Sequence, residues 1–291
     1  MRKAYIAFIL ALMYVPIVLV ILYSFNASRL SSVWSGFSLT WYSDLFRDRS
    51  MFTALRNSLI LAAVSSLSAA VIGTLGAVGA AWDTGKYADR PDAKLAIKTR
   101  VGHGLEYLSI LPIMTPEIIL GMVLLVFFSL LRFPLGMLTL ILAHTCFCIP
   151  YVYLLVKARL AGLDKSYTEA ARNLGAGPWR AFWDVLLPLL LPAIISGILL
   201  SFAMSFDDVI ISIFVTGPQT NTLPIRIYSQ IKTGVTPKTN ALCSIIFIIT
   251  LLLCILSMVV SRIKPGGGVS SDKEGDSINL SKNIKPDRRI S

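Results

Sequence analysis

The stretch LLLPAIISGILLSFAMSF, residues 189–206, contains no charged side chain and is followed by two adjacent aspartates, Asp207 and Asp208. A helix that rises about 1.5 Å per residue needs roughly 20 mostly apolar residues to cross the hydrocarbon core of a bilayer. The stretch therefore predicts a membrane-spanning helix over 189–206. Because the segment VIISIFV after the aspartates is again apolar, a longer alternative extends the same span to 215.

The rest of the chain has the composition of a membrane protein. Of its 291 residues, 55% are hydrophobic and 15% are charged, and the mean hydropathy is +0.71, well above that of a soluble domain. The long apolar runs, in place of alternating strands of about ten residues, predict an all-α, polytopic membrane helical bundle and not a β-barrel. Six transmembrane spans fit the pattern, at about 4–25, 58–82, 105–131, 137–157, 189–206 (or to 215) and 241–261.

Lysine and arginine are unevenly divided between the loops that join these spans. With the N-terminus in the cytoplasm, 19 of the 27 Lys and Arg residues lie on the cytoplasmic side, which such residues favour in membrane proteins. We therefore expect both termini in the cytoplasm. Topology also accounts for most of the formal net charge of +11, so nucleic acid is not an expected partner.

The composition changes after the last span. Residues 265–291 are polar and nearly free of aromatic residues, which predicts a disordered cytoplasmic tail behind a transmembrane domain of residues 1–264. The loop 83–104 and this tail contain no motif that assigns them a role. All four cysteines lie in apolar runs, so we expect neither a disulfide framework nor a metal site.

The longest patterned cytoplasmic loop covers residues 158–188. In its first half, apolar or small residues recur at spacings of three or four, as on one face of an amphipathic helix; these residues are Leu163, Tyr167, Ala170, Ala171 and Leu174. Gly175 is expected to end this helix, and a second amphipathic segment with Trp179 and Trp183 leads into the next span. Spacing alone leaves two interpretations, a helix that docks on a partner and a helix that lies on the membrane surface.

One motif in this loop resembles the EAA signature of bacterial ABC-importer permeases, written E-A-A-x3-G-x9-I-x-L-P. The matching residues are Glu169, Ala170, Ala171, Gly175, Leu187 and Pro188, with Val185 where the signature has isoleucine. This resemblance implies the MetI-like fold of type I ABC importers, in which the loop is a coupling helix that docks on a cytoplasmic ATPase subunit. It also implies a transporter subunit and not an enzyme.

Further segments resemble the spermidine/putrescine permeases of the PotC type. Among them are SILPIMTPEIILGMVLLVFF at 109–128, HTCFCIPYVYLLVKARL at 144–160 and SFDDVIISIFVTGPQT at 205–220. This resemblance implies an ATP-driven importer of the bacterial inner membrane that brings polyamines into the cytoplasm and depends on an extracytoplasmic polyamine-binding protein. The other implied partners are a homologous second permease and two copies of the ATPase.

ATP and Mg²⁺ are expected on the ATPase, and no cofactor is expected on this chain. The nearest approach to a phosphate-binding loop runs from Gly79 to Tyr87. It has five residues between its glycines where four are needed, and tyrosine stands where Ser or Thr would bind the metal. The chain therefore requires another polypeptide to hydrolyse ATP.

Three carboxylates, Glu117, Asp207 and Asp208, lie within or at the end of predicted spans. A buried aspartate costs about 2.5 to 3.5 kcal/mol on membrane-insertion scales, so such residues mark a functional site by default. A polyamine is a chain of ammonium groups, which carboxylates and aromatic faces can host in place of water. We therefore expect a substrate pathway that includes Trp41, Glu117, Ser205, Asp207 and Asp208.

The adjacency of the two aspartates limits this expectation. Neighbouring helical residues point about 100° apart, so we expect one of the pair to face the pathway and the other to bind a backbone amide or a partner subunit. The alternative is that both merely cap the outer end of the span. His144 is alone in its span, which is more typical of a hydrogen-bonded core imidazole than of a gate or proton carrier.

Two other functions remain open on the sequence. The EAA loop is also compatible with an importer for an amino acid, iron or a sugar. An intramembrane hydrolase would use His144 with a serine and an aspartate, although the chain contains neither G-x-S-x-G nor H-E-x-x-H. Within the polyamine hypothesis, nothing ranks spermidine against putrescine.

Overall fold

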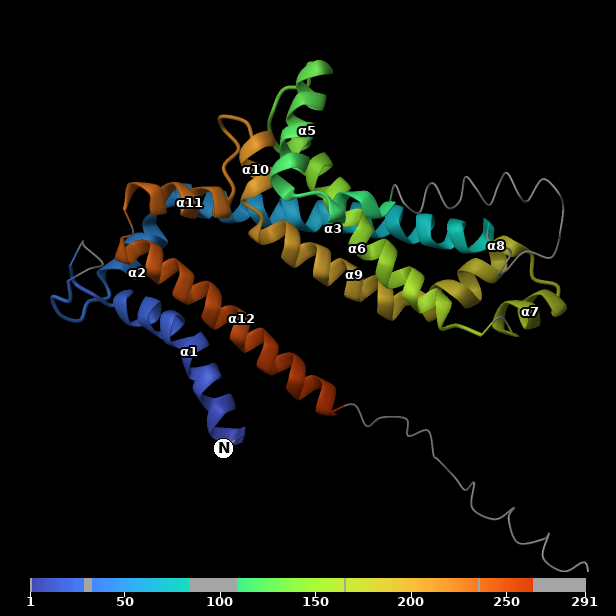
Figure 1. Cartoon of the computed structure of the whole chain (residues 1–291), viewed down its shortest axis with the longest axis horizontal. Coiled ribbons are helices and arrows are strands. Elements are labelled where there is room, and N and C mark those ends of the chain that lie inside the picture. The colour runs from blue at the N-terminus through green and yellow to red at the C-terminus, as the bar shows by residue number, and fades with distance from the viewer. Residues whose placement is uncertain (1, 29–32, 84–108, 165, 235, 264–291) are drawn as a thin grey trace, which may run out of the picture. The chain divides into compact units, whose positions relative to one another are not determined.

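The computed structural model describes residues 2–28, 33–83, 109–164, 166–234 and 236–263, and most of these residues are helical (Figure 1). The contacts divide the chain within its last helix, into a unit Met1–Cys243 and a unit Ser244–Ser291. The packed helices described below belong to the first unit. The tail predicted over 265–291 and the loop 84–104 lie outside the described residues.

Three long helices form the centre of the first unit: α3 (Arg49–Asp83), α6 (Met137–Ala161) and α9 (Leu187–Asp207). They approach closely where glycine replaces a side chain. A Cβ added at Gly73 of α3 would lie 3.0 Å from the Cβ of Val152 on α6, and one added at Gly197 of α9 would lie 3.2 Å from the Cα of the same valine. Val152 of α6 therefore packs between Gly73 and Gly197, and the absence of a side chain at each glycine lets α3, α6 and α9 approach closely.

The predicted third span is divided into two helical segments. Residues 109–114 are helical, Thr115 and Pro116 are not, and α5 begins at Glu117 and ends at Leu130. Proline has no N–H to donate and its ring excludes the preceding turn of helix, so the break falls at Pro116. Glu117, expected in the middle of a helix over 105–131, is therefore the first residue of α5, while residues 105–108 lie outside the described part.

The predicted fifth span ends at the aspartates. Helix α9 stops at Asp207, Asp208 takes an extended conformation (φ −65°, ψ 126°), and a separate helix α10 runs over Ile210–Val215. The shorter alternative, 189–206, is thus close to the observed helix. Helix α10 packs against α5, where a Cβ at Gly121 would come within 2.6 Å of the Phe214 ring.

The remaining helices precede, connect or follow these central ones along the chain. Helix α1 (Arg2–Tyr23) leads through a segment with one β-bridge, Asn26 to Phe37, into α2 (Thr40–Arg47). After α10 come α11 (Leu223–Thr233) and α12 (Pro237–Ile263). The loop after α6 forms α7 (Ser166–Asn173), α8 (Pro178–Ala181) and a π-helical turn η1 (Phe182–Leu186) that runs into α9.

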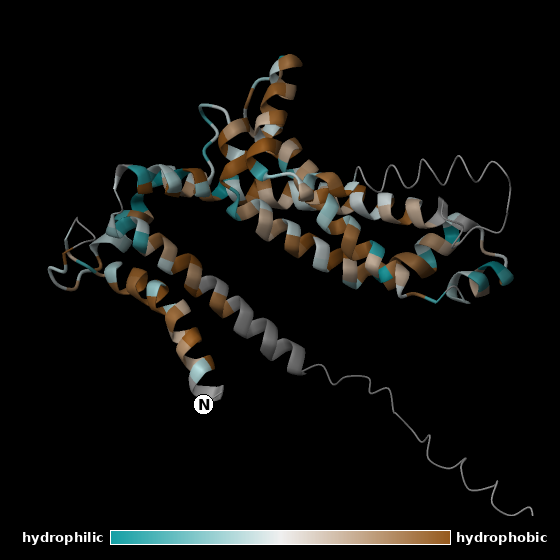
Figure 2. Cartoon of the chain, viewed as in Figure 1, coloured by the Kyte–Doolittle hydropathy of each residue, from teal (hydrophilic) through white to brown (hydrophobic). Residues whose placement is uncertain are grey.

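In Figure 2 brown, apolar residues predominate along α1 and α5, whereas α2, α7 and α11 are largely teal or pale. Four helical segments among the described residues are long and apolar enough to cross a membrane: Tyr5–Tyr23, Arg49–Ala81, Met137–Ala161 and Trp179–Asp207. Helix α5 is apolar but shorter, because the break at Pro116 starts it late. The described residues form an all-helical membrane fold; each of the six predicted spans contains helix, and four of the six coincide with segments long enough to cross a membrane.

Candidate functional site

The two aspartates lie in different environments at the break between α9 and α10. Asp208 is 8% exposed, and its carboxylate oxygens accept hydrogen bonds from the backbone N–H groups of Ile211 (3.2 Å) and Ser212 (2.9 Å). The first N–H groups of a helix have no partner within the helix, so a carboxylate placed just before it satisfies them. Asp207, the last residue of α9, is exposed.

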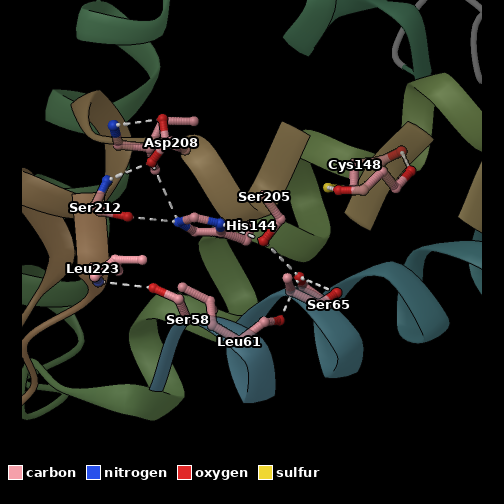
Figure 3. A network of polar contacts seen from close by, with 12 residues as sticks. Ser58, Leu61, Ser65, His144, Cys148, Ser205, Asp208, Ser212 and Leu223 are labelled. Carbon is pink, nitrogen blue, oxygen red and sulfur yellow. Dashed lines mark hydrogen bonds and ion pairs between the residues drawn. The ribbon is translucent and has the colours of Figure 1, made fainter. Parts of the chain in front are cut away.

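His144 lies beside Asp208 in a buried polar network that Figure 3 shows. Its Nδ1 is 2.8 Å from the Ser205 hydroxyl, and its Nε2 is 3.0 Å from the Ser212 hydroxyl and 3.4 Å from Asp208 Oδ2. Ser205 is also 3.0 Å from Ser65 on α3. The network therefore joins α3, α6, α9 and α10, and it lies in the buried interior beside the break between α9 and α10.

Glu117 approaches the same region from a second helix break. It is half-buried at the start of α5, and its carboxylate is within electrostatic range of both Asp208 and Asp207. The half-buried Tyr151 of α6 is in turn within electrostatic range of Glu117. The fold thus brings the exposed carboxylate of Asp207 and the half-buried carboxylate of Glu117 into the same region, each from an interrupted span, with Tyr151 within electrostatic range of Glu117.

The other predicted pathway residues are placed differently. Ser205 is 2% exposed and points into the network, where His144 and Ser65 occupy its hydroxyl group. Trp41 is half-buried in α2, and its indole N–H donates to the Asn26 carbonyl oxygen at 2.7 Å. The described contacts of Trp41 therefore lie in the segment between α1 and α2 and not with the carboxylates.

The predicted coupling loop has a short exposed helix at its centre. Glu169 and Ala170 are exposed on α7, while Ala171 is buried. Gly175 ends the segment with a positive φ of 84°, and the N–H groups of Gly175 and Ala176 bond back to Arg172 and Ala171, as in a glycine-terminated helix. Pro188, also exposed, lies in the first turn of α9, directly after the π-helical turn η1.

Parts of the apolar face predicted for this loop have no cover in the single chain. Leu163 is buried, but Tyr167 is 52% exposed and Leu174 is 89% exposed. Burying apolar area is favourable by about 25 cal/mol per Å², so this face gains free energy when a partner covers it. The loop therefore presents a carboxylate, small residues and uncovered apolar side chains together.

Sequence reasoning did not predict the partners of His144. Ser65 and Ser212 carry no signal of their own, because a serine in an apolar helix is common and usually bonds to its own backbone. It also did not find the ion pair between Asp48 and Lys238, whose partners lie in different predicted loops. His144 stood out in the sequence because it is isolated in an apolar span, but the sequence did not indicate which residues it contacts.

The network also bears on the hydrolase hypothesis, since Ser205, His144 and Asp208 lie in a row. A nucleophilic serine must reach a substrate, yet Ser205 is 2% exposed and His144 is fully buried. The Asp208 carboxylate is also occupied by two backbone N–H groups. This arrangement holds helices together and offers no accessible nucleophile.

Comparison with known proteins identifies relatives of the whole chain. A family model described as "Binding-protein-dependent transport system inner membrane component" matches residues 93–263. The spermidine/putrescine transport system permease protein PotC of Escherichia coli (strain K12) is 37% identical over 273 residues, which cover 94% of this chain and 98% of that protein. The putrescine transport system permease protein PotI of the same strain is 39% identical over 240 residues, covering 80% and 81%.

Solved structures share the fold at low sequence identity. A chain of a bacterial ABC transporter involved in the import of the acidic polysaccharide alginate matches with a TM-score of 0.65 and 14% identity, over 91% of this chain and 95% of its own. A chain of the MetNI methionine ABC transporter, in an inward-facing conformation, matches with a TM-score of 0.57 and 19% identity, over 74% and 97%. Both are ABC importers, so the helical arrangement is that of importer permeases.

Proposed function

The chain belongs to the family of binding-protein-dependent transport system inner membrane components, and from that premise we propose that the solute it passes inward is a polyamine, spermidine or putrescine. It is a multi-pass permease subunit of an ABC transport system and not an enzyme. The similarity to polyamine permeases, at 37% identity over 94% of the chain, supports the substrate. The observation that carries the proposal is the approach of Glu117 and Asp207 at two helix breaks.

A polyamine loses water from its ammonium groups when it enters the membrane domain, and each desolvated charge needs a partner. We assign that role to Asp207 and Glu117, whose carboxylates are exposed and half-buried respectively. Tyr151 offers an aromatic face close to Glu117, and cations bind favourably over such faces. Asp208 and Ser205 belong to the pathway as its inner wall, and Trp41 belongs to its outer entrance.

Transport requires energy that this chain does not supply, so it works with an ATPase and with a binding protein that delivers the solute. We assign the α7 loop with Glu169, Ala170, Ala171, Gly175 and Pro188 to the contact with the ATPase, because that loop is exposed and its apolar face is uncovered. The assembly proposed contains two ATPase copies and a homologous second permease, with both termini of this chain in the cytoplasm. Movement of the loop then exposes the carboxylates to each side in turn.

Uptake by the reconstituted complex tests the substrate. Vesicles that contain both permeases, the ATPase with ATP inside and the binding protein outside should accumulate labelled spermidine or putrescine. The Asp207→Asn complex should accumulate roughly tenfold less, the loss expected when about 1.4 kcal/mol of binding is removed. Accumulation of an amino acid, a sugar or iron in place of both polyamines would show that the substrate proposal is wrong.

A further inference from the structure

We propose that His144 is a positioning residue of the substrate pathway, which fixes the break between α9 and α10 through Ser212, the residue whose backbone N–H is bound by Asp208, and so keeps Asp207 on the accessible side, within electrostatic range of Glu117. The importance of this arrangement for transport rests on the proposed function. The geometric claim does not, since it concerns only how one buried ring holds a helix break.

The direction of the hydrogen bonds assigns a role to each ring nitrogen. The Ser65 hydroxyl lies 2.6 Å from the Leu61 carbonyl oxygen, which can only accept, so Ser65 donates to it. Ser205 then donates to the Ser65 oxygen at 3.0 Å, and His144 Nδ1 donates to the Ser205 oxygen at 2.8 Å. Nδ1 therefore carries the proton of the neutral ring and is committed to α9, so Nε2 can only accept, and it accepts from the Ser212 hydroxyl group at 3.0 Å. The Asp208 carboxylate 3.4 Å away is itself an acceptor, and Ser212 links it to the ring by donating its backbone N–H to Asp208.

The Nε2 side of the ring is the side that defines the break. Nε2 lies within 3.4 Å of Ser212 of α10 and of Asp208. Asp208 in turn accepts hydrogen bonds from the backbone N–H groups of Ile211 and Ser212, in the first turn of α10. The ring comes from α6, which packs against α9 and α10. His144 therefore holds the end of one helix and the beginning of the next against a third.

The consequence for Asp207 follows from its position in the chain. Asp207 precedes Asp208 directly, so its side chain cannot share the inward direction that the Asp208 carboxylate takes. Asp208 is 8% exposed whereas Asp207 is exposed, as this reasoning requires. If the ring releases Ser212, Asp208 keeps only its bonds to the N–H groups of Ile211 and Ser212 in the short helix α10, and α10 is no longer held to α6 through the ring.

Thiol labelling at position 207 tests the inference without any substrate. A chain with Asp207→Cys, in the assembled complex, is treated with a membrane-impermeant maleimide, and labelling of the chain without that substitution is subtracted to account for its native cysteines. His144→Gln places its amide near the position of Nε2, and His144→Asn places its amide near Nδ1, so these two variants form a matched pair.

We expect the Gln variant to label at position 207 within about twofold of the His144 chain, and the Asn variant to differ by about fivefold or more, because only Gln places an amide oxygen where it can accept from the Ser212 hydroxyl group. In the Asp207 background, uptake should be lost in the Asn variant and rescued in the Gln variant. Equal labelling of all three chains, equal change in both variants, or failure of both to insert into the membrane would overturn the proposal. Labelling as expected in a complex that imports another solute would refute the polyamine assignment alone.

Discussion

The ammonium group of Lys238 lies 2.6 Å from the carboxylate of Asp48, so the start of α12 is tied to the start of α3 across 190 positions of the sequence. Arg226 of α11 lies 3.9 Å from the same carboxylate oxygen. The other carboxylate oxygen accepts from Ser50 and from the Met51 N–H. This cluster joins α3 to the helices that follow α10, at the end of α3 where α2 leads into it.

Removing the Asp48 charge should loosen that junction. Burial raises the pKa of Asp48, but hydrogen bonds from Lys238, Ser50 and Met51 and the charge of Lys238 outweigh it, so the pKa lies well below its ordinary value. Asp48→Asn leaves Lys238 without its counter-ion and should lower the free energy of unfolding by about 1 to 3 kcal/mol. Thermal unfolding in detergent measures this change, and Asp44→Asn, on the exposed part of α2, is the matched control.

The same carboxylate predicts a pH dependence. Because the pKa of Asp48 is lower in the folded protein, the unfolded chain binds the proton first as the pH falls. The stabilisation is therefore complete above the ordinary value of 3.8 and is lost as the pH falls from there toward the folded pKa. The difference in melting temperature between wild type and Asp48→Asn should shrink through this range, and a constant difference down to the lowest pH would contradict the assignment.

The two neighbouring aspartates should respond differently to the same substitution. Asp207→Asn removes an exposed charge and should reduce polyamine uptake roughly tenfold while the amount of assembled complex stays unchanged. Asp208→Asn replaces one of the two oxygens that accept a backbone N–H with an NH2 donor, and should reduce the melting temperature of the complex as well, since a buried donor left without an acceptor costs about 1 to 3 kcal/mol. Uptake and melting temperature, measured on the same preparations, separate the two roles. Identical effects of both substitutions would refute them.

A charge reversal in the α7 loop should separate transport from ATP hydrolysis. Glu169→Lys changes an exposed side chain, so insertion into the membrane should be normal while ATP-driven uptake falls by tenfold or more, about 1.4 kcal/mol in coupling. Asp44→Lys is the control, because Asp44 is exposed on α2, outside this loop. Full uptake with Glu169→Lys would remove the loop from the ATPase contact.

Two glycines of α3 should give changes of opposite sign. An alanine at Gly73 would place its Cβ 3.0 Å from the Ile149 carbonyl oxygen, so the helices must separate, and we expect a loss of about 1 to 3 kcal/mol in stability. An alanine at Gly79 would meet no atom within 4 Å and should be neutral or stabilising by up to about 1 kcal/mol, since alanine favours helix. Melting temperatures of the two variants in the same detergent test this, and a stable Gly73→Ala chain would show that the crossing can relax.

The helix positions follow from local signals in the sequence. Hydropathy is read along the chain over roughly 20 residues, so the positions of α6 and α9 could be predicted, whereas the single span predicted over 105–131 missed the break at Pro116. The family resemblance of the α7 loop also comes from one continuous segment, Glu169 to Pro188. Glu117, Asp207 and Asp208 stood out because an apolar run makes any carboxylate conspicuous.

The sequence by itself therefore determined the class of protein, its helices and the three carboxylates in or beside apolar runs, because each depends on neighbours in the chain. Only the tertiary structure decided which aspartate faces outward, and which groups His144 and Lys238 meet. Asp208 turns inward because its backbone is extended at the end of α9 and because His144, 64 positions earlier, lies against it. Such directions depend on dihedral angles at a helix break and on contacts between distant segments, and no local pattern encodes either.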